Sequence, residues 1–416
     1  MKKVAFWLSF LFLFILFFSN CGNNDNIINI AVIGPMKMAE GVGIKTGVQL
    51  AAQEINKKGG IEVSGIKYKV KLHFIDDRFS DVTYASIQLR KAIEEKGCTF
   101  VIGGFSSKVV LPLLDIVSQK KVLWFGTGGA SPKIVGKVKK DYNNYKYYLR
   151  VGTMDATLQG RTIAEFATNI LLPKGYKKAA IIGVNHSYTK YLCNDAKKYM
   201  EAAGFEIVSL DYVSSKIKDF TPYFNKAKKN ADLIVGVFLT GETDVFIKQV
   251  HSSGLYKQMP IIGQIQKLQY SRYDYGNKFA TNISTLQAQS GPVDMTGTGQ
   301  SIKFARKYKK RFPNINQHWQ SYPAYDALKI YKTAVEKSDS FRIDDILKVI
   351  EHPDFEYLGN IRYKWHKDNH DLFVGEINNV MYANFVWFQF FPDGKKYCVY
   401  PEKFKQKNYI YPRKNK

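Results

Sequence analysis

Cysteine is scarce in this sequence, and its spacing excludes two kinds of structural framework. The 416 residues contain four cysteines, Cys21, Cys98, Cys193 and Cys398, and no two of them form a CxxC pair. Neither a disulfide framework nor a cysteine-based zinc site is therefore expected. Cys98 directly precedes an apolar run at residues 99–102, so we expect its thiol to be buried and free.

Recognisable catalytic motifs are absent as well. The sequence has no GxSxG or HExxH motif, and no glycine-rich phosphate loop that ends in Lys-Ser or Lys-Thr. His366 and His370 lie four residues apart, but in WHKDNHD, where we expect a solvated turn between strands rather than a metal site. Asp76 and Asp77 follow a predicted strand and are expected to cap and orient loops. We therefore predict no enzymatic activity, no cofactor and no bound metal.

The apolar segment near the start of the chain is too short to cross a membrane. Lys2 and Lys3 precede an apolar run of about 15 residues at 4–18, whereas a membrane-spanning helix needs ~20 residues. A charged start followed by a short apolar run is typical of an export signal. We predict that residues 1–20 are a signal peptide.

Cys21 follows this segment directly and precedes a polar stretch at 22–26. The junction resembles a bacterial lipoprotein signal, although Phe18 and Asn20 stand where such signals usually have Leu and a small residue. We predict that Cys21 is acylated, that residues 21–28 form a lipidated tether, and that the protein is anchored to a membrane at the periplasmic or cell-surface side. An ordinary secretory signal that is cleaved elsewhere is the alternative.

Acidic residues are few relative to basic ones, with 36 Asp and Glu against 61 Lys and Arg, for a formal charge of +25. Such an excess would favour a nucleic-acid partner if the cations were clustered. The lysines are instead spread over predicted helices and turns, and an exported protein rarely meets nucleic acid, so we expect none. A solvated, lysine-rich surface that faces anionic lipid or polysaccharide is the preferred interpretation. Residues 398–416 form a basic tail, which we expect to be a surface extension.

The rest of the chain alternates strand-like and helix-like segments. Residues 29–61 contain a short apolar run, a Gly-Pro turn at 34–35, apolar residues at helical spacing over 44–55, and a Gly-Gly stop at 59–60. The same order recurs and then restarts after residue 147, which for this length predicts two α/β lobes. The alternation specifies parallel sheets, whose ligands bind beyond the carboxyl ends of the strands.

Several segments match one known family in order. They are AVIGPM at 31–36, EIN at 54–56, GGI at 59–61, VIGGFSS at 101–107, LRVGTMDATLQG at 149–160 and DFTPYFNKAKKNADLIVGV at 219–237. This series resembles the type I periplasmic binding proteins, and most closely the Leu/Ile/Val-binding proteins that feed ABC importers. The resemblance covers about residues 29–391.

The resemblance implies an α/β fold of two Rossmann-like lobes joined by a three-crossing hinge, with the ligand bound between the lobes by hinge closure. The crossings are expected near Val151, near Leu286 and near residues 359–361. The expected segments are 29–150 plus 287–360 for lobe 1, 151–286 plus 361–397 for lobe 2, and 398–416 for the basic tail. The same resemblance implies a monomer.

In amino-acid-binding members of the family, hydroxyl and backbone donors of lobe 1 receive the ligand carboxylate. The resemblance places Ser107 at this site, with a helix N-cap as its alternative role. It also places Gly128 and Ala130 there, although the family has a Thr hydroxyl where this chain has Ala130. Ser131 could supply that hydroxyl, or it could only cap a helix whose first residue is Pro132.

Lobe 2 is expected to supply an acidic residue for the ligand ammonium, and the resemblance places Glu242 there. The alternative is an exposed Glu in the first turn of a helix. Tyr188 falls on the Tyr that closes over the ligand, with a surface Tyr as the alternative, and Phe105 falls on an apolar residue of the side-chain pocket. Glu40 lies near a position where an aromatic residue is common, in a loop at 36–41 that is about two residues short.

These expectations define a lipid-anchored, extracytoplasmic solute-binding protein that captures an amino acid or related small polar solute for an ABC permease. The alternative is a sensory or interaction lipoprotein with the same fold and a different or lost ligand. The missing hydroxyl at Ala130 favours this alternative, whereas Ser107 and Glu242 favour solute capture.

Overall fold

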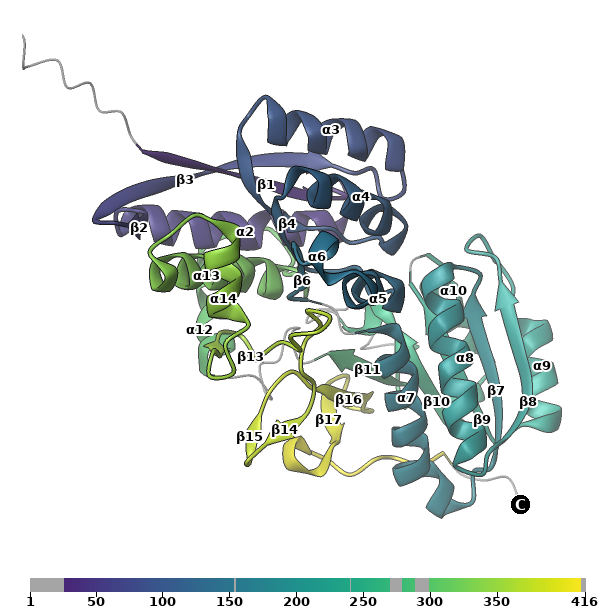
Figure 1. Cartoon of the computed structure of the whole chain (residues 1–416). Helices are drawn as coiled ribbons and strands as arrows, with labels where there is room; N and C mark the ends of the chain where they lie inside the picture. Colours follow the sequence, from purple (N-terminus) through teal and green to yellow (C-terminus); the bar gives the residue numbers. More distant parts are fainter. Residues whose placement is uncertain (1–25, 153–154, 240, 270–278, 289–298, 413–416) are drawn as a thin grey trace, which may run out of the picture.

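Two α/β lobes, each built on a mainly parallel sheet, make up the molecule (Figure 1). The structure is a computed structural model that describes residues 26–152, 155–239, 241–269, 279–288 and 299–412. The predicted class, α/β with two Rossmann-like lobes, is confirmed. The predicted signal peptide at 1–20 and the predicted lipidation site Cys21 lie outside the described residues.

The sheet of lobe 1 has six strands in the order β2-β3-β1-β4-β5-β6. The strands are β1 (Ile27–Gly34), β2 (Ile61–Val63), β3 (Ile66–Asp76), β4 (Cys98–Gly103), β5 (Leu123–Gly126) and β6 (Tyr148–Arg150). All neighbours pair in parallel except β2 with β3. β1 lies in the interior of the sheet and is covered on both faces, which explains why its apolar run is nearly continuous.

Helices cover both faces of this sheet. They are α2 (Ala39–Lys57), α3 (Val82–Glu94), α4 (Ser107–Lys120), α5 (Pro132–Lys140), α6 (Tyr142–Tyr145), α12 (Gly299–Arg311), α13 (Ser321–Ser338) and α14 (Ile343–Ile350). Alternate residues of β1 point to opposite faces. Val32 therefore belongs to the same buried cluster as Val48 of α2, and Ile33 belongs to the cluster on the other face, with Val109 of α4. At Gly47 an added Cβ would lie 2.3 Å from the Ser321 carbonyl oxygen, so α2 and α13 approach closely there.

Lobe 2 has a parallel sheet in the order β10-β9-β7-β8. Its strands are β7 (Lys178–Val184), β8 (Glu206–Val213), β9 (Leu233–Phe238) and β10 (Ile261–Ile265). Its helices are α7 (Ala156–Phe166), α8 (Ser187–Ala202), α9 (Thr221–Asn230) and α10 (Gly241–Ser252). A π-helical segment at Ala167–Leu171 and short 3-10 helices at Leu172–Lys174, Leu255–Lys257 and Gln266–Gln269 complete the lobe.

An antiparallel sheet extends lobe 2. It joins β11 (Ser284–Ala288), β16 (Phe385–Phe390) and β17 (Lys396–Tyr400), and a bridge from Ile261 to Ile283 connects it to β10. Two small hairpins precede it, β12 (Tyr357–Leu358) with β13 (Arg362–Tyr363), and β14 (Glu376–Ile377) with β15 (Val380–Met381).

The chain passes between the lobes near the ends of β6, β11 and α14. Val151 and Gly152 follow β6, and their amides donate to the Gly126 carbonyl oxygen. The expected boundary at Leu286 falls inside β11, and the segment that follows, 289–298, lies outside the described residues. The third crossing runs beside the first, because the Trp365 indole N–H donates to the Arg150 carbonyl oxygen at 2.7 Å.

Two sequence predictions about surface segments are wrong. The sequence predicts that the lysine-rich end of the basic tail, residues 403–416, is a surface extension, but Tyr409 within it is 7% exposed, and residues 413–416 lie outside the described residues. The Tyr411 ring stacks on Tyr176. In this segment tyrosines alternate with lysines along the sequence, and the tyrosine rings pack on α7 and β16. His370 is likewise buried rather than solvated, with its ring between Glu351 and the Tyr148 carbonyl oxygen.

Two helices begin in the loops that follow strands β4 and β7. α4 begins at Ser107, and α8 begins at Ser187. Strands β10 and β11 were not predicted at all. Cys98 is buried with a free thiol, as predicted.

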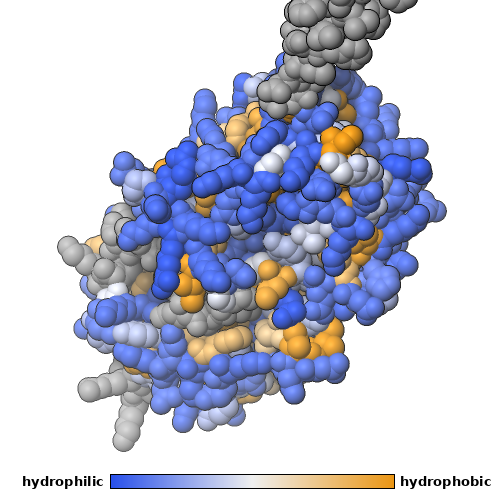
Figure 2. Space-filling view, turned by 90° about the vertical axis from the view of Figure 1, so that its left-hand side faces the viewer, coloured by the Kyte–Doolittle hydropathy of each residue, from blue (hydrophilic) through white to orange (hydrophobic). Residues whose placement is uncertain are grey.

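Figure 2 shows a face on which hydrophilic residues predominate and apolar areas are small and separate. This agrees with the expected solvated surface. Within the described part of the chain, no helix has both the length and the apolar character needed to cross a membrane.

Candidate functional site

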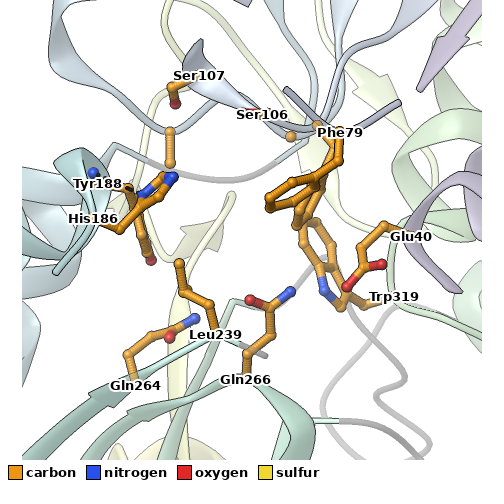
Figure 3. Close-up of a pocket in the computed structure, with 13 residues that line it drawn as sticks. Glu40, Phe79, Ser106, Ser107, His186, Tyr188, Leu239, Gln264, Gln266 and Trp319 are labelled. Atoms are coloured by element: carbon orange, nitrogen blue, oxygen red, sulfur yellow. Dashed lines mark hydrogen bonds between the residues drawn. The ribbon is translucent and has the colours of Figure 1, made fainter. Parts of the chain in front are cut away.

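A pocket lies between the two lobes, where loops from both sheets meet (Figure 3). It contains about 580 Å³ of space free of protein atoms, part of it open to solvent. Lobe 1 contributes Glu40, Phe79, Phe105, Ser106, Ser107, Gly128, Ala130 and Trp319, and lobe 2 contributes His186, Tyr188, Leu239, Gln264 and Gln266. Most of these residues follow strands, as expected for a parallel sheet.

Ser107 lies at the start of α4 and lines the pocket. The N-cap position belongs to Ser106, so the alternative N-cap role of Ser107 is not what the structure shows. The Ser107 hydroxyl oxygen accepts a hydrogen bond from the Ser131 amide at 3.0 Å, which leaves its proton available to the pocket. The amides at the N-terminus of α4 are also hydrogen-bond donors, so the part of the pocket beside Ser107 favours an anionic group.

Gly128 and Ala130 form the adjoining edge of the pocket, in the loop after β5. An added Cβ at Gly128 would lie 2.6 Å from Gln320 Nε2 and 2.8 Å from the Phe105 Cα, so only glycine fits. The Ala130 carbonyl oxygen accepts the Ala156 amide of α7 at 2.9 Å. The pocket edge of lobe 1 is therefore bonded to the first helix of lobe 2.

Ser131 is not among the residues that line the pocket in the described structure. Its hydroxyl accepts from the Lys133 amide at 3.3 Å and caps α5, whose first residue is Pro132. The capping alternative for Ser131 is thus the one observed.

On lobe 2, His186 caps α8 through Nδ1, which accepts the Tyr188 amide at 3.3 Å. Burial lowers the pKa of His186, and the Glu242 charge opposes this effect only in part. A neutral imidazole with Nδ1 as acceptor has its proton on Nε2. Tyr188 is not a surface residue, because its hydroxyl donates to Gln159 and its ring lines the pocket.

Glu242 is the second residue of α10 and is 1% exposed, which rules out the exposed first-turn alternative. Its Oε1 accepts the Leu239 amide at 2.7 Å. Leu239 lines the pocket whereas Glu242 does not appear among the described lining residues. The carboxylate therefore lies behind the loop that faces the ligand space.

The sequence analysis does not assign eight of the described lining residues to ligand contact: Glu40, Phe79, Ser106, His186, Leu239, Gln264, Gln266 and Trp319. Phe79, His186 and Leu239 lie in loops after strands, so the rule for parallel sheets could have selected them. Gln264 and Gln266 were missed because β10 was missed. Trp319 lies between two helices, where no general rule points to a ligand.

Two polar side chains of the pocket have a buried atom with no hydrogen-bond partner in the described part of the chain. They are Trp319, through Nε1, and Gln264, through Oε1. Their residues are 8% and 6% exposed. Buried polar atoms are normally satisfied. A donor and an acceptor left open on opposite lobes are what a polar ligand would satisfy.

Comparison with known proteins identifies the family to which this chain is similar. A family model described as periplasmic binding protein matches residues 28–380. The Leu/Ile/Val/Thr-binding protein of Salmonella typhimurium is 25% identical over 309 residues, which cover 73% of this chain and 78% of that protein.

Two solved structures share the fold. A candidate branched-chain amino acid ABC transporter protein from Silicibacter pomeroyi superposes with a TM-score of 0.79 at 18% identity, over 93% of this chain and 99% of that one. A solute-binding protein of an ABC transporter from Rhodopseudomonas palustris, in complex with p-hydroxybenzoic acid, gives a TM-score of 0.72 at 16% identity, over 88% and 98%.

Proposed function

Because this chain belongs to the periplasmic binding protein family, we propose that it captures an amino acid or a related small solute between its lobes and delivers it to an ABC permease. The observation that supports this proposal best is the pocket itself, which takes residues from both lobes. A solute that contacts both lobes favours the closed arrangement, and a closed form is what a permease can recognise.

The solute is proposed to present a carboxylate to lobe 1. Ser107, with the amides at the start of α4, supplies neutral donors in a region where the helix dipole favours negative charge. Because Gly128 has no side chain, its loop can lie close to the loop that contains Phe105, beside the proposed carboxylate site. Ala130 contributes its backbone only, so specificity at this end depends on Ser107 and on main-chain groups.

The solute ammonium is proposed to be received by lobe 2, near Gln264 and the loop before α10. Gln264 Oε1 has no hydrogen-bond partner in the described part of the chain. The Glu242 carboxylate is buried behind Leu239, whose amide it binds, and so places a negative charge near the pocket. At this distance from the pocket, Glu242 acts on the ligand through its field and by fixing the loop that faces it.

Cys21 is proposed to be acylated, with residues 21–28 as the tether. Two or more acyl chains at ~0.8 kcal/mol per buried CH₂ would hold the protein at the membrane. The anchor would keep the binding protein near its permease at the outer side of the membrane.

A second candidate is capture of an aromatic carboxylic acid. The pocket favours it through Phe79, Phe105 and Trp319, whose rings neighbour one another on lobe 1. The Rhodopseudomonas palustris protein with the same fold holds p-hydroxybenzoic acid. A ligand of this kind would use the Ser107 corner and leave the open Gln264 acceptor unpaired unless it also has a hydroxyl group.

Native mass spectrometry of the purified protein, followed by a melting-temperature screen, tests both candidates. The screen contains free amino acids, their deaminated acids, their amides, and benzoates. A ligand at ~100 times its dissociation constant stabilises the fold by ~2.7 kcal/mol, which a melt detects. The proposed function requires a shift with amino acids that disappears for the deaminated acids.

Glu242→Gln should weaken amino-acid binding by about 10-fold or more, since it removes a buried charge near the ligand. Glu201→Gln is the matched control, because Glu201 is exposed and pairs only loosely with Lys197 at 3.7 Å. A shift with benzoates alone would select the aromatic-acid candidate. A screen without any shift would argue for the sensory alternative.

A further inference from the structure

We propose that Asp326 is a positioning residue of the hinge, whose ionised carboxylate holds the third crossing against α13 and so favours the arrangement in which both lobes line the pocket. This inference rests on the proposed capture of a solute by lobe closure. It adds to that function a residue outside the described pocket lining, together with a dependence of solute binding on pH.

Two hydrogen bonds join the Asp326 carboxylate to the third crossing. Asp326 belongs to α13 of lobe 1 and is 1% exposed. Its Oδ2 accepts the Asn360 amide at 2.7 Å and the Tyr363 hydroxyl at 2.8 Å. Hydrogen bonds to an ionised acceptor are roughly twice as strong as those between neutral groups. One oxygen of a buried carboxylate thus binds both the backbone and a side chain at the crossing.

The crossing also packs directly on this carboxylate. An added Cβ at Gly359 would lie 2.7 Å from Cγ and from both carboxylate oxygens of Asp326, so only glycine allows the approach. The next two residues, Asn360 and Ile361, are buried. Any movement of this turn relative to α13 therefore changes its contacts with the carboxylate.

These contacts continue to the first crossing. The Tyr363 ring stacks on Trp365, with the ring centroids 5.9 Å apart. The Trp365 indole N–H donates to the carbonyl oxygen of Arg150, the last residue of β6. Asp326 is therefore connected to both crossings through packed and hydrogen-bonded side chains, and a change in its charge can bias both.

α13 connects the same carboxylate to the pocket. Trp319 lines the pocket and lies two residues before Ser321, where α13 begins. Asp326 is only five residues further along the helix, a rise of about 7.5 Å. The pocket wall and the contact with the crossing thus belong to neighbouring parts of one helix, so that the position of the crossing and the shape of the pocket are linked.

Asp326 changes its charge close to neutral pH. Burial raises its pKa from 3.8 to about 7, and the hydrogen bonds from Asn360 and Tyr363 oppose this rise. Hydrogen bonds that lower a pKa are stronger to the ionised form. Ionisation therefore strengthens the hold on the crossing, and protonation weakens it. Because the contacts exist in the arrangement in which both lobes line the pocket, solute affinity should rise as the pH rises through 7.

Charged and titratable groups surround the carboxylate on α13, α2, α12 and the β12–β13 hairpin. They are Tyr325, Lys329, Glu54, Lys303, Lys307, Tyr357 and Tyr363. Burial raises the pKa of the three tyrosines away from neutrality. Burial also acts to raise the pKa of Glu54, but hydrogen bonds from Lys307, Tyr325 and Lys329 lower it to about 2, so Glu54 stays ionised and compensates the charge of Lys329.

The first test follows the hinge without a solute, in the full mature chain. Hydrogen–deuterium exchange should show that the peptide around Asn360 gains protection as the pH rises from 5.5 to 8.5, after correction for the intrinsic exchange rate, with a midpoint near pH 7. Small-angle scattering should show compaction over the same range. Global stability changes in the opposite direction, because a folded-state pKa above the unfolded one lowers stability as the pH rises. A purely structural role would therefore give the reverse trend.

Two variants identify the group that titrates. Asp326→Asn should remove the midpoint, whereas Tyr363→Phe should move it to higher pH, because one bond that favours the ionised form is lost. Tyr357→Phe is the matched control, since Tyr357 pairs with Tyr363 in the hairpin but does not bond to Asp326 in the described structure. Asp368→Asn is the second control, because Asp368 is exposed and its bond to Lys139 lowers its pKa.

Isothermal titration with L-leucine at pH 5.5 and 8.5 then measures the effect on binding. The ratio of the two affinities should be about 5-fold larger in the unaltered protein than in Asp326→Asn. Equal ratios, or crossing protection that does not change with pH, would overturn this inference while leaving the proposed function intact. Protection and compaction that titrate in a protein that binds no amino acid would support the role of Asp326 and contradict the proposed function.

Discussion

Replacement of Arg150 by Met should destabilise the fold strongly, because Arg150 joins three segments at the hinge. Its side chain is 1% exposed. Nε lies 2.7 Å from Asp371 Oδ1, in the segment after the third crossing, and Nη2 lies 3.7 Å from Asp155 Oδ2 before α7. The guanidinium also donates to the Gly129 and Ser131 carbonyl oxygens beside the pocket.

The expected magnitude follows from what the substitution leaves behind. Met fills most of the volume, but the carboxylates of Asp155 and Asp371 would remain buried without the cation between them. Breaking a buried ion pair from one side costs about 3–5 kcal/mol. Urea denaturation followed by tryptophan fluorescence should show a loss of this size in the free energy of unfolding at pH 7.

The pH dependence gives a second, independent check. Burial raises the pKa of Asp155, and Arg150 opposes that rise. Without Arg150 the folded-state pKa moves further above the unfolded value, so ionisation costs more stability at neutral pH. The carboxyl is protonated in both states at low pH, and the deficit of the variant should therefore shrink as the pH falls towards 4.

Two controls separate the charge effect from packing. Arg150→Met combined with Asp371→Asn should recover a large part of the loss, since one buried charge is removed. Arg150→Lys keeps the charge but loses the fork of donors, and should be intermediate. A loss below 1 kcal/mol in Arg150→Met, or a deficit that stays constant from pH 7 to pH 4, would refute the reasoning.

Three further predictions concern single groups. Ser107→Ala removes a donor to a charged ligand group, worth ~1.5–3 kcal/mol, and should weaken solute binding roughly 10- to 150-fold. Titration should show a smaller change for Ser106→Ala, and equal effects would contradict the assignment. Burial raises the pKa of Asp77 from 3.8 to about 6, so the folded state loses roughly 3 kcal/mol at most as the pH rises from about 4 through 6. Asp77→Asn should remove this loss, and identical pH–stability curves for both proteins would show that Asp77 does not titrate as described. Cys21→Ser should move the protein from the membrane fraction to the soluble extracytoplasmic fraction, and an unchanged membrane fraction would disprove acylation.

The sequence predicts the parallel sheets well because their strands are buried on both faces. β1, β4 and β9 are short apolar runs followed by helical periodicity, so pattern and structure agree. β10 has Gly263 and Gln264 within its five residues, and three of the five residues of β11 are polar. Both are too short and too polar for periodicity to select them.

Gly128, Ala130 and Ser107 line the pocket, and their role in ligand contact stays a prediction. They follow strands β4 and β5, so chain order is sufficient to bring them to one edge of the sheet. Glu242 differs, because the direction of its side chain depends on the hydrogen bond to the Leu239 amide. Trp319 reaches the pocket through packing of α13 on α2, a contact between segments more than 250 residues apart that no local pattern encodes.

In the proposed function, the same few residues connect ligand contact with lobe movement. The loop that contains Gly128 and Ala130 lines the pocket, and its carbonyl groups bond to Arg150 and to the Ala156 amide at the first crossing. A solute that orders this loop therefore changes the energy of the hinge contacts, and closure in turn changes the loop. By linkage, each process must favour the other to the same extent. A substitution at Arg150 should consequently alter solute affinity and the closed population together, although Arg150 is not among the described residues that line the pocket.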